Sequence, residues 1–226
     1  MSHLSVAFVL FPNVTQLDLT GPAQVLSRLS DATCHLVATS HAPVATDAGF
    51  SIVPTTTFGE LPRPDIICVP GGAGADDAME DPVVLEWLRT ASASAQWITS
   101  VCTGSLVLGA AGLLKGKRAT SHWAARAMLE HFGATPVDER VVFDGNLVTG
   151  GGVTAGIDFA LALMAELRGP DHARLVQLAL EYDPPPPFDA GSPASVDPTI
   201  LNQFSQLSQQ SQVTRERRVI AAAAKI

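Results

Sequence analysis

The stretch WITSVCTGSLVLGAAGLL, residues 97–114, joins a strand-like run to a helix-like run through a cysteine. Residues 97–101 are rich in β-branched and aromatic side chains, which predicts a strand. Residues 105–114 are rich in leucine and alanine, which favour a helix. Cys102 lies at the junction. A strand that runs directly into a helix is the repeating unit of a parallel α/β sheet, so this stretch predicts the fold class.

The rest of the chain repeats the alternation of strand and helix. Apolar runs predict further strands at 4–11, 34–39, 65–69, 141–143 and 147–149, and a hairpin excursion at 46–57. Helices are expected at 15–29, 81–93, 122–132, 155–167 and 171–181. This order predicts a three-layer α/β/α sandwich around a mostly parallel, flavodoxin-like sheet, with Cys102 at a strand–helix elbow.

The domain organisation follows from length and proline content. The chain has 226 residues, which suits one α/β domain and is short for two. Four consecutive prolines at 184–187 predict the end of that domain, which therefore covers residues 1–187. Residues 188–226 are rich in Gln and Ser. We expect one or two helices within 196–218, packed on the domain or on a neighbouring subunit.

Composition narrows the function classes and the compartment. Hydrophobic residues make up 46% of the chain, charged residues 16%, and the formal net charge is −8. The acidic balance argues against a broad nucleic-acid-binding surface. The sequence contains no recognisable secretory signal or membrane-spanning run, so we expect a cytoplasmic protein that does not bind membranes. Three cysteines are too few for a disulfide scaffold, which leaves each thiol as core filling or as a nucleophile.

Cys102 is the cysteine whose position favours chemistry. In an open parallel sheet, reactive groups gather where strands end and helices begin. A helix N-terminus stabilises a thiolate, so we expect the pKa of Cys102 to be lowered. The amide of Thr103 is then available to stabilise negative charge on a substrate. The alternative is a small buried core residue, and that interpretation is favoured for Cys34 and Cys68, which lie inside apolar runs.

Two more segments contribute candidates at the same sheet edge. The run PGGAG, residues 70–74, follows a predicted strand, and its glycines permit a backbone amide to point into the site. Phosphate binding is disfavoured there, because Asp76 and Asp77 would repel an anion. Asp18 follows the first strand. If its carboxyl faces the cleft, desolvation would raise its pKa and let it hold a proton for a substrate, although a helix N-cap role is an alternative.

His122 is the best histidine candidate for the site. It lies at the start of a predicted helix, where a structural role is the alternative. No metal site is expected, because the other histidines are scattered without metal-ligand spacing: His3, His35, His41, His131 and His172.

Five motifs in order resemble the ThiJ/PfpI superfamily, which has the class-I glutamine-amidotransferase-like fold. They are LDLTGP with Asp18, ICVPGG ending at Gly72, SVCTGSLVLGAAGLL with Cys102, KRATSHW with His122, and LVTGGGVTAGIDFAL. Within the superfamily the chain is most similar to the isonitrile hydratases, in which an aspartate replaces the common glutamate and a threonine follows the cysteine. Many members have Cys-His at the elbow, so Cys-Thr here counts against a Cys-His-Asp/Glu triad.

The resemblance implies a role for each matching residue. Cys102 is implied as the nucleophile, Asp18 as its acid/base partner and Thr103 as a further catalytic contact. The amides of Gly72 and Thr103 are implied to form the pocket that stabilises negative charge, with His122 also at the site. The implied enzyme needs no cofactor or metal, acts on a small molecule and forms a homodimer.

The implied reaction converts an isonitrile into the N-substituted formamide through a thioimidate on Cys102. Three other functions stay open on the same thiol. One is glyoxalase or deglycase-type chemistry on reactive aldehydes. Another is ligand sensing, because AraC-type regulators carry a domain with similar motifs, although only about forty residues follow the prolines here. The third is redox sensing by an oxidisable Cys102.

Overall fold

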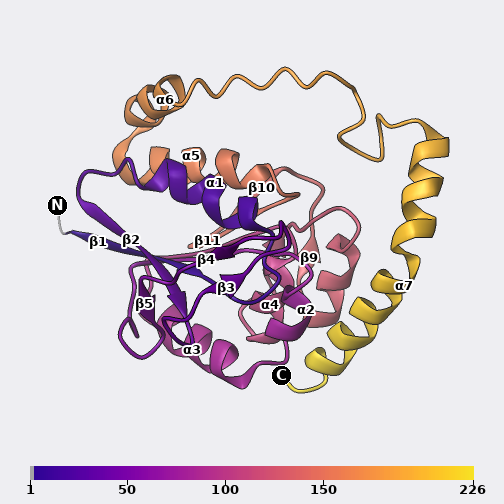
Figure 1. Cartoon of the computed structure of the whole chain (residues 1–226), viewed down its shortest axis with the longest axis horizontal. Helices are drawn as coiled ribbons and strands as arrows, with labels where there is room; N and C mark the ends of the chain where they lie inside the picture. The colour runs from indigo at the N-terminus through magenta and orange to yellow at the C-terminus, as the bar shows by residue number, and fades with distance from the viewer. Residues whose placement is uncertain (1–2) are drawn as a thin grey trace.

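The structure is a computed structural model that describes residues 3–226, so the first two residues of the predicted 1–187 domain lie outside the described residues. Its centre is a seven-stranded sheet in the order β10-β11-β7-β6-β1-β2-β5 (Figure 1). The strands are β1 (Leu4–Val9), β2 (Ala32–Ala38), β5 (Thr56–Thr57), β6 (Ile66–Val69), β7 (Trp97–Val101), β10 (Val141–Asp144) and β11 (Leu147–Gly150). All neighbours are parallel except β10 and β11, which form an antiparallel pair.

The predicted flavodoxin-like fold is confirmed. The five central strands, β2-β1-β6-β7-β11, follow the flavodoxin-like order 2-1-3-4-5. In such a sheet the second strand lies on one side of β1, and the later strands lie on the other side. A crevice opens outside the carboxyl ends of the strands at this switch point. Here the switch lies between β1 and β6, so the segments after β1, β6 and β7 meet at one edge.

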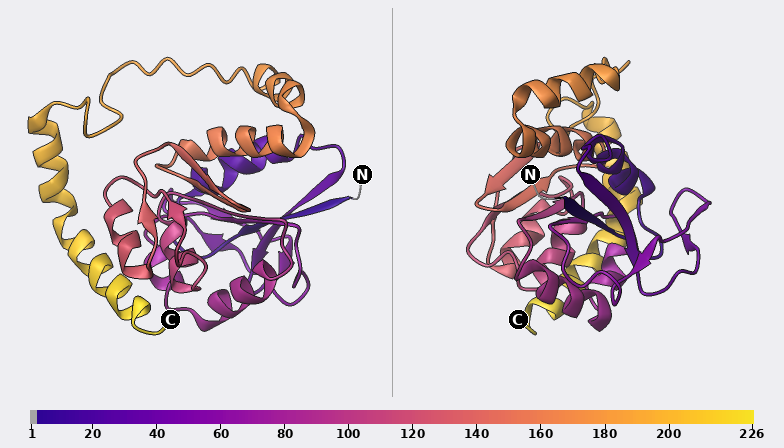
Figure 2. Two further views of the ribbon diagram at one scale, coloured as in Figure 1. Left: turned by 180° about the vertical axis from the view of Figure 1, so that it is seen from behind. Right: turned by 90° about the vertical axis from the view of Figure 1, so that its left-hand side faces the viewer.

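Helices cover both faces of the sheet, which gives the three predicted layers (Figures 1 and 2). Helices α1 (Gln16–Leu26) and α5 (Ala155–Arg168) form one layer, and α6 (Pro170–Ala179) packs on the side of α5 that faces away from the sheet (Figure 2). The other contains α2 (Ala75–Ala78), α3 (Pro82–Ser92), α4 (Gly104–Ala110) and the 3-10 helix η1 (Arg126–Phe132). Helix α7 (Pro198–Ala223) follows a long extended linker and packs along this second layer. Within the described residues, no helix is long and apolar enough to cross a membrane.

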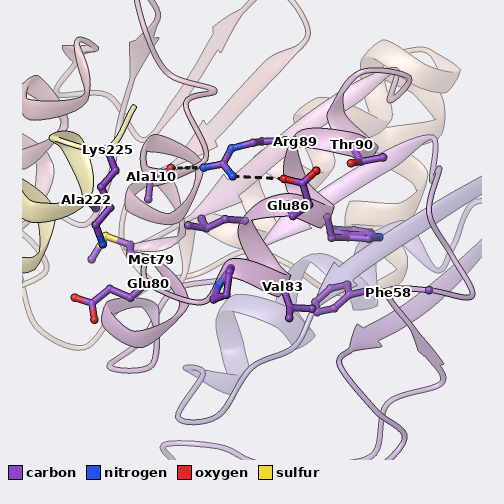
Figure 3. A pocket seen from close by; sticks show the side chains of 14 residues that line it. Phe58, Met79, Glu80, Val83, Glu86, Arg89, Thr90, Ala110, Ala222 and Lys225 are labelled. Carbon is purple, nitrogen blue, oxygen red and sulfur yellow. Dashed lines mark hydrogen bonds and ion pairs between the residues drawn. The ribbon is translucent and has the colours of Figure 1, made fainter.

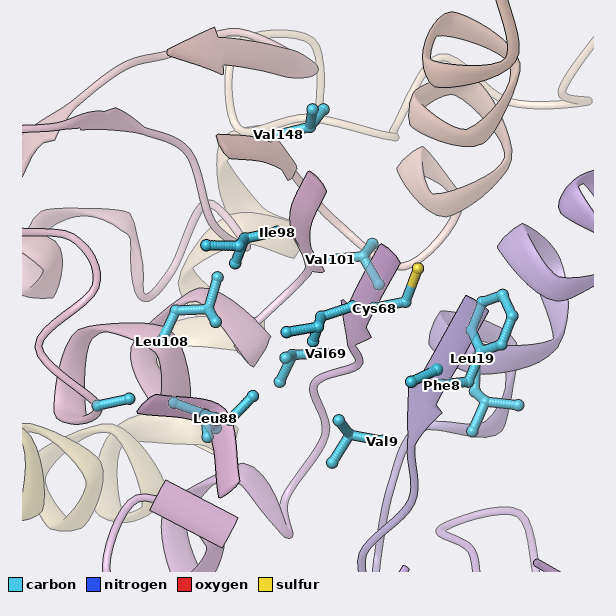
Figure 4. Packing of buried hydrophobic residues seen from close by; sticks show 14 of the residues in the cluster. Phe8, Val9, Leu19, Cys68, Val69, Leu88, Ile98, Val101, Leu108 and Val148 are labelled. Carbon is cyan, nitrogen blue, oxygen red and sulfur yellow. The ribbon is translucent and has the colours of Figure 1, made fainter. Parts of the chain in front are cut away.

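The central strands are buried on both faces because each face carries a helical layer. On strand β1, Phe8 points toward α1, whereas Val9 points toward the α3–α4 side, as alternation along a strand requires (Figure 4). Phe8 packs near Leu19 of α1, and Val69 near Leu88 and Leu108 of the other layer (Figure 4). All four residues of β6 are buried. The continuous apolar runs in the sequence therefore fill a two-sided core.

Several element boundaries differ from the sequence predictions. Helix α4 ends at Ala110 rather than at 114, because Gly112 takes a φ of 83° and stops it. Within the predicted helix 122–132, only Arg126–Phe132 is helical, and it is a 3-10 helix. The segment 46–57 is partly a hairpin, formed by β3 (Val44–Ala45) and β4 (Ser51–Ile52), and its last residues form the edge strand β5. A further short pair joins β8 (Arg118–Ala119) and β9 (Thr135–Pro136).

Candidate active site

The turn after strand β7 holds Cys102 in an unusual backbone conformation. Its φ is 57°, a left-handed value that costs a residue with a side chain about 1–2 kcal/mol. The Cys102 amide donates to the carbonyl oxygens of Gly151 at 2.7 Å and Gly150 at 3.2 Å. Its carbonyl oxygen accepts from Ser121 Oγ at 2.9 Å and from Ser105 Oγ at 3.2 Å. Hydrogen bonds on both sides of the residue therefore offset the strain of the elbow.

The loop after strand β6 approaches the elbow so closely that only glycine fits. A Cβ atom on Gly71 would lie 2.5 Å from Thr103 N and 3.0 Å from Asp18 Oδ2. Gly72 has a φ of 119°, and a Cβ there would lie 2.4 Å from the amide nitrogen of Thr15. The Gly71 amide donates to Asp18 Oδ2 at 2.9 Å. The two glycines therefore let the loop contact both the elbow and helix α1.

Asp18 lies in the first turn of helix α1, and only 1% of the residue is exposed. Burial raises the pKa of Asp18 to about 7, although the Gly71 amide and the Cys102 thiol act in the opposite direction. The N-cap alternative is wrong, since Thr15 takes the cap position. Within residues 3–226, Asp18 Oδ1 has no partner in hydrogen-bond geometry. A buried carboxyl that is half protonated near neutral pH can pass a proton to and from a bound molecule.

Cys102 titrates in the opposite sense to the sequence expectation. Burial withdraws its thiolate from water, and the charge of Asp18 lies beside it, so the pKa of Cys102 is raised well above the usual range. The amide and hydroxyl of Thr103 act in the opposite direction without outweighing burial. The expected lowering by the N-terminus of α4 is therefore wrong. The thiol becomes a nucleophile only when a neighbouring base takes its proton, and Asp18 is next to it.

Thr103 links the elbow to the loop after strand β6. The Gly72 amide donates to Thr103 Oγ1 at 3.0 Å, and the Thr103 hydroxyl is also placed to donate to the Gly72 carbonyl oxygen at 3.2 Å. Thr103 is 3% exposed. The Thr103 amide interacts with the Cys102 thiol. In this structure the Gly72 amide therefore binds Thr103, whereas the Thr103 amide faces the Cys102 thiol.

His122 lies beside the elbow and lines the hollow next to it. Its Nδ1 accepts from the Ala124 amide at 3.3 Å, which places the ring proton on Nε2. Burial, together with the charge of Arg215, lowers the pKa of His122, so the ring is neutral at pH 7. The hollow has a volume of about 850 Å³ and is also lined by Ser121 and Gly151, which contact the main chain of the elbow. Across residues 3–226, no three His, Cys, Asp or Glu side chains gather as a metal site would require.

The sequence pattern of the DJ-1/PfpI family matches residues 4–166, which contain Asp18, Cys102 and Thr103. The chain belongs to the DJ-1/PfpI family. The predicted membership of the ThiJ/PfpI superfamily is thereby confirmed, and the motifs at the switch point are family motifs rather than isolated coincidences.

Relatives with known names cover different lengths of this DJ-1/PfpI chain. It is 54% identical over 223 residues to the isonitrile hydratase of Pseudomonas putida, which covers 99% of this chain and 98% of that protein. It is 33% identical over 150 residues to the HTH-type transcriptional regulator CdhR of Pseudomonas aeruginosa, which covers 66% of this chain but 44% of the regulator. A crystal structure of a ThiJ/PfpI family protein from Pseudomonas syringae matches with a TM-score of 0.93 and 43% identity over 99% of this chain and 91% of that chain.

The structure brings together most of the predicted site residues of this DJ-1/PfpI protein. Asp18 and Thr103 both lie against Cys102, and the loop that carries Gly71 and Gly72 contacts both of them, whereas His122 lies in the neighbouring hollow. The sequence indicated Gly71 only as part of the glycine run 70–74, whose amides were expected to point into the site, and it did not single out Ser121 or Gly151. The contacts of these two residues cross between segments distant in the chain, and their only sequence signal was their presence inside family motifs.

A second large hollow lies on the α3 side of the molecule (Figure 3). Its volume is about 810 Å³, and apolar side chains such as Phe58, Met79 and Val83 line it. Arg89 crosses its rim, donating to the Ala110 carbonyl oxygen at 3.4 Å and pairing with Glu86 (Figure 3). The residues that line it do not include Asp18, Cys102 or Thr103.

Proposed function

We propose that this DJ-1/PfpI protein is an isonitrile hydratase, a cofactor-independent lyase that adds water to an isonitrile and releases the N-substituted formamide. The observation that carries the proposal is the buried contact between the Asp18 carboxyl and the Cys102 thiol, each of which shifts the pKa of the other. The near-full-length similarity to a named isonitrile hydratase supports the same reaction. An isonitrile carbon needs a nucleophile and a proton, and this pair supplies both.

The first half-reaction uses the pair when it holds one proton. Asp18 removes the proton from the Cys102 thiol, and the sulfur attacks the terminal carbon of R–N≡C. Asp18 then delivers the same proton to that carbon. A C–S bond and a C–H bond form while one C–N π bond is lost. The product is a thioimidate, Cys102–S–CH=N–R, and Asp18 is left ionised.

The second half-reaction consumes one water. The Asp18 carboxylate takes a proton from the water as its oxygen adds to the thioimidate carbon, and Asp18 passes that proton to the nitrogen. The remaining hydroxyl proton returns to Asp18 as the C–S bond breaks, with the bonding electrons leaving on sulfur. The formamide HC(=O)–NH–R departs, and the pair again holds one proton. The sum of the two halves is one isonitrile plus one water.

Three further residues support this cycle in the proposal. The Thr103 amide stabilises negative charge on the sulfur, because it already interacts with the thiol. Gly72 holds the Thr103 hydroxyl in place and thereby shapes the pocket for the intermediate. The neutral His122 presents an Nε2–H donor in the adjacent hollow, where it can bind the substrate or the departing formamide.

The test is formamide production from cyclohexyl isocyanide by wild-type protein and by Cys102→Ala and Asp18→Asn. We expect turnover by the wild type and loss of turnover in both variants, each shown to be folded by circular dichroism. A folded wild type without turnover would sink the proposal. Aldehyde consumption, assayed with methylglyoxal, and ligand binding without turnover are the other outcomes that the same protein samples can reveal. The similarity to CdhR covers 66% of this chain and 44% of that regulator.

The proposed assembly is a homodimer held by the C-terminal arm, residues 183–213. Residues 183–195 are all exposed, and the linker runs far from the sheet before α7 begins (Figure 1). The far end of α7 is tied down, since Arg215 Nε pairs with Asp76 Oδ1 at 2.6 Å and Val219 is fully buried. The arm is therefore anchored to its own domain beyond its C-terminal end, while most of its length is solvent-exposed.

Exposed apolar side chains are concentrated on the arm and on the helix before it. Seven of the twelve exposed large apolar residues among those described lie between 175 and 213: Leu175, Leu178, Phe188, Ile200, Phe204, Leu207 and Val213. From 184 to 213 the only charged side chains are those of Asp189 and Asp197. A two-fold interface joins the same surface patch of both copies, so a weakly charged apolar surface suits contact with a second copy of a chain whose net charge is −8.

Sedimentation velocity tests the assembly. We expect wild-type protein at twice the 23.6 kDa chain mass. Leu207 lies on α7 and is 81% exposed, and we expect the variant Leu207→Glu to be a monomer. The matched control is Val83→Glu on α3, at a site that is 52% exposed, and we expect it to remain a dimer. A dimeric Leu207→Glu would contradict the arm contact. A cytoplasmic location and the absence of nucleic-acid binding stay predictions from the sequence.

A further inference from the structure

Cys102 adopts a conformation that its own segment does not favour. A φ of 57° at a non-glycine residue persists only where surrounding contacts hold it. Two serine hydroxyls donate to the Cys102 carbonyl oxygen, Ser105 at 3.2 Å and Ser121 at 2.9 Å. Neither belongs to the groups that act on the isonitrile in the proposed reaction.

The two serines differ in what they can hold. Ser105 is three residues from Cys102, in the first turn of α4, so its bond moves with the elbow. Ser121 is nineteen residues away and comes from the loop after β8. Only a bond from a separate segment can fix the elbow relative to the rest of the protein.

The segment that carries Ser121 is itself fixed. The amide of the preceding residue, Thr120, donates to Thr149 Oγ1 on strand β11 at 2.9 Å. Ser121 is 1% exposed and Thr149 is fully buried. The chain from strand β11 through Thr120 to Ser121 therefore forms a rigid support that ends at the Cys102 carbonyl oxygen.

We propose that Ser121 is a positioning residue that holds Cys102 in its left-handed conformation and thereby keeps the thiol beside the Asp18 carboxyl. Without the Ser121 hydroxyl, the elbow keeps only its local bond from Ser105 and the amide bonds to residues 150 and 151. The turn then relaxes toward ordinary φ values, and the sulfur moves away from Asp18. The kinetic part of this proposal rests on the proposed hydratase function, whereas the conformational part does not.

The experiment compares Ser121→Ala with Ser105→Ala and Ser121→Thr in the full-length protein. The first readout is the φ of Cys102 in the crystal structure of Ser121→Ala, which we expect to leave the left-handed region. The second is steady-state hydration of cyclohexyl isocyanide. We expect Ser121→Ala to lower kcat about tenfold or more with KM changed less than about twofold, and Ser105→Ala to lower kcat by less than about threefold.

Ser121→Thr separates positioning from stability. It keeps the hydroxyl donor but adds a methyl group at a buried position, so it should lower Tm while keeping kcat within about threefold of wild type. A Ser121→Ala variant that keeps Cys102 in the left-handed conformation, or a folded one that keeps kcat within about twofold, would overturn the proposal. If the wild type does not hydrate isonitriles, the proposed function fails, and the crystal structure of Ser121→Ala still decides the role of Ser121.

Discussion

Cys68 and Cys102 come from neighbouring strands of one sheet and have opposite surroundings. Both are buried, at 3% and 6% exposure. Cys68 belongs to the regular strand β6, where its sulfur accepts from Thr99 Oγ1 at 3.1 Å, and burial raises its pKa to about 12 (Figure 4). Cys102 lies one residue past strand β7, in a left-handed turn beside the Asp18 carboxyl.

The difference shows that burial does not by itself make a thiol reactive. Burial raises the pKa of both sulfurs, so neither is ionised at neutral pH. Only Cys102 has a base next to it whose own pKa, about 7, suits proton transfer at that pH. We therefore propose that the reactive unit is the Asp18–Cys102 pair together with the turn that holds it, and four predictions test this proposal.

The largest effect is expected from removing each sulfur in turn. Cys102→Ala should lower kcat/KM for cyclohexyl isocyanide at least about 10⁴-fold, because no other group can form the thioimidate. Cys68→Ala is the matched control. It should keep kcat/KM within about threefold and lower the free energy of unfolding by about 1 kcal/mol through loss of core packing. Equal activity in the two variants would remove the distinction between the cysteines.

Asp18→Asn should stabilise the protein at alkaline pH. The pKa of Asp18 rises from 3.8 to about 7 on folding, so the folded state binds this proton more tightly than the unfolded state does. Ionisation of Asp18 therefore destabilises the folded state. This destabilisation begins above pH 3.8, grows as pH rises and reaches its full size above pH 7. Removing the charge should raise the free energy of unfolding at pH 8 by up to about 4 kcal/mol, and by less at pH 5. Urea titrations at the two pH values measure this difference, and an equal or smaller gain at pH 8 would contradict it.

Gly71→Ala should lower activity by displacing the groups of the site, without removing any of them. The added methyl would lie 2.5 Å from Thr103 N and 3.0 Å from Asp18 Oδ2, so the loop or the elbow must shift. We expect kcat/KM to fall about 100-fold, the scale seen when reacting groups move by about 1 Å. Gly59→Ala is the control, because a Cβ there meets no atom within 4 Å. Similar activities for Gly71→Ala and Gly59→Ala would show that the close approach at the elbow is not needed.

The fourth prediction concerns the pH dependence of the wild type. The reaction needs the pair with one proton, so the fully protonated form below the Asp18 pKa of about 7 is inactive. We expect kcat/KM to rise about tenfold per pH unit below that value and to level off above it. A profile measured from pH 5 to 9 that falls as pH rises through 7 would mean that the doubly protonated pair is the active form.

Much of the fold was predictable because its signals are local. The continuous apolar run that became strand β1 and the Asp81–Pro82 start of α3 are written in neighbouring residues, and Asp81 caps that helix as its sequence suggests. Boundaries set by backbone conformation were less accessible, such as the early end of α4 at Gly112. The family motifs also pointed to Asp18 and Cys102 before any contact between them was visible.

The sequence by itself determined that this is an α/β protein of the DJ-1/PfpI family with a cysteine at a strand–helix junction. Periodicity, turn residues and motif order are properties of the sequence itself, so they can be recognised without knowledge of the fold. The tertiary structure alone decided the direction of the thiol pKa. Helix position argued for lowering it, but burial and the neighbouring Asp18 charge raise it. It also revealed the Ser121 contact. Solvent exclusion and contacts between distant segments depend on how layers close over one another, which no short stretch of sequence records.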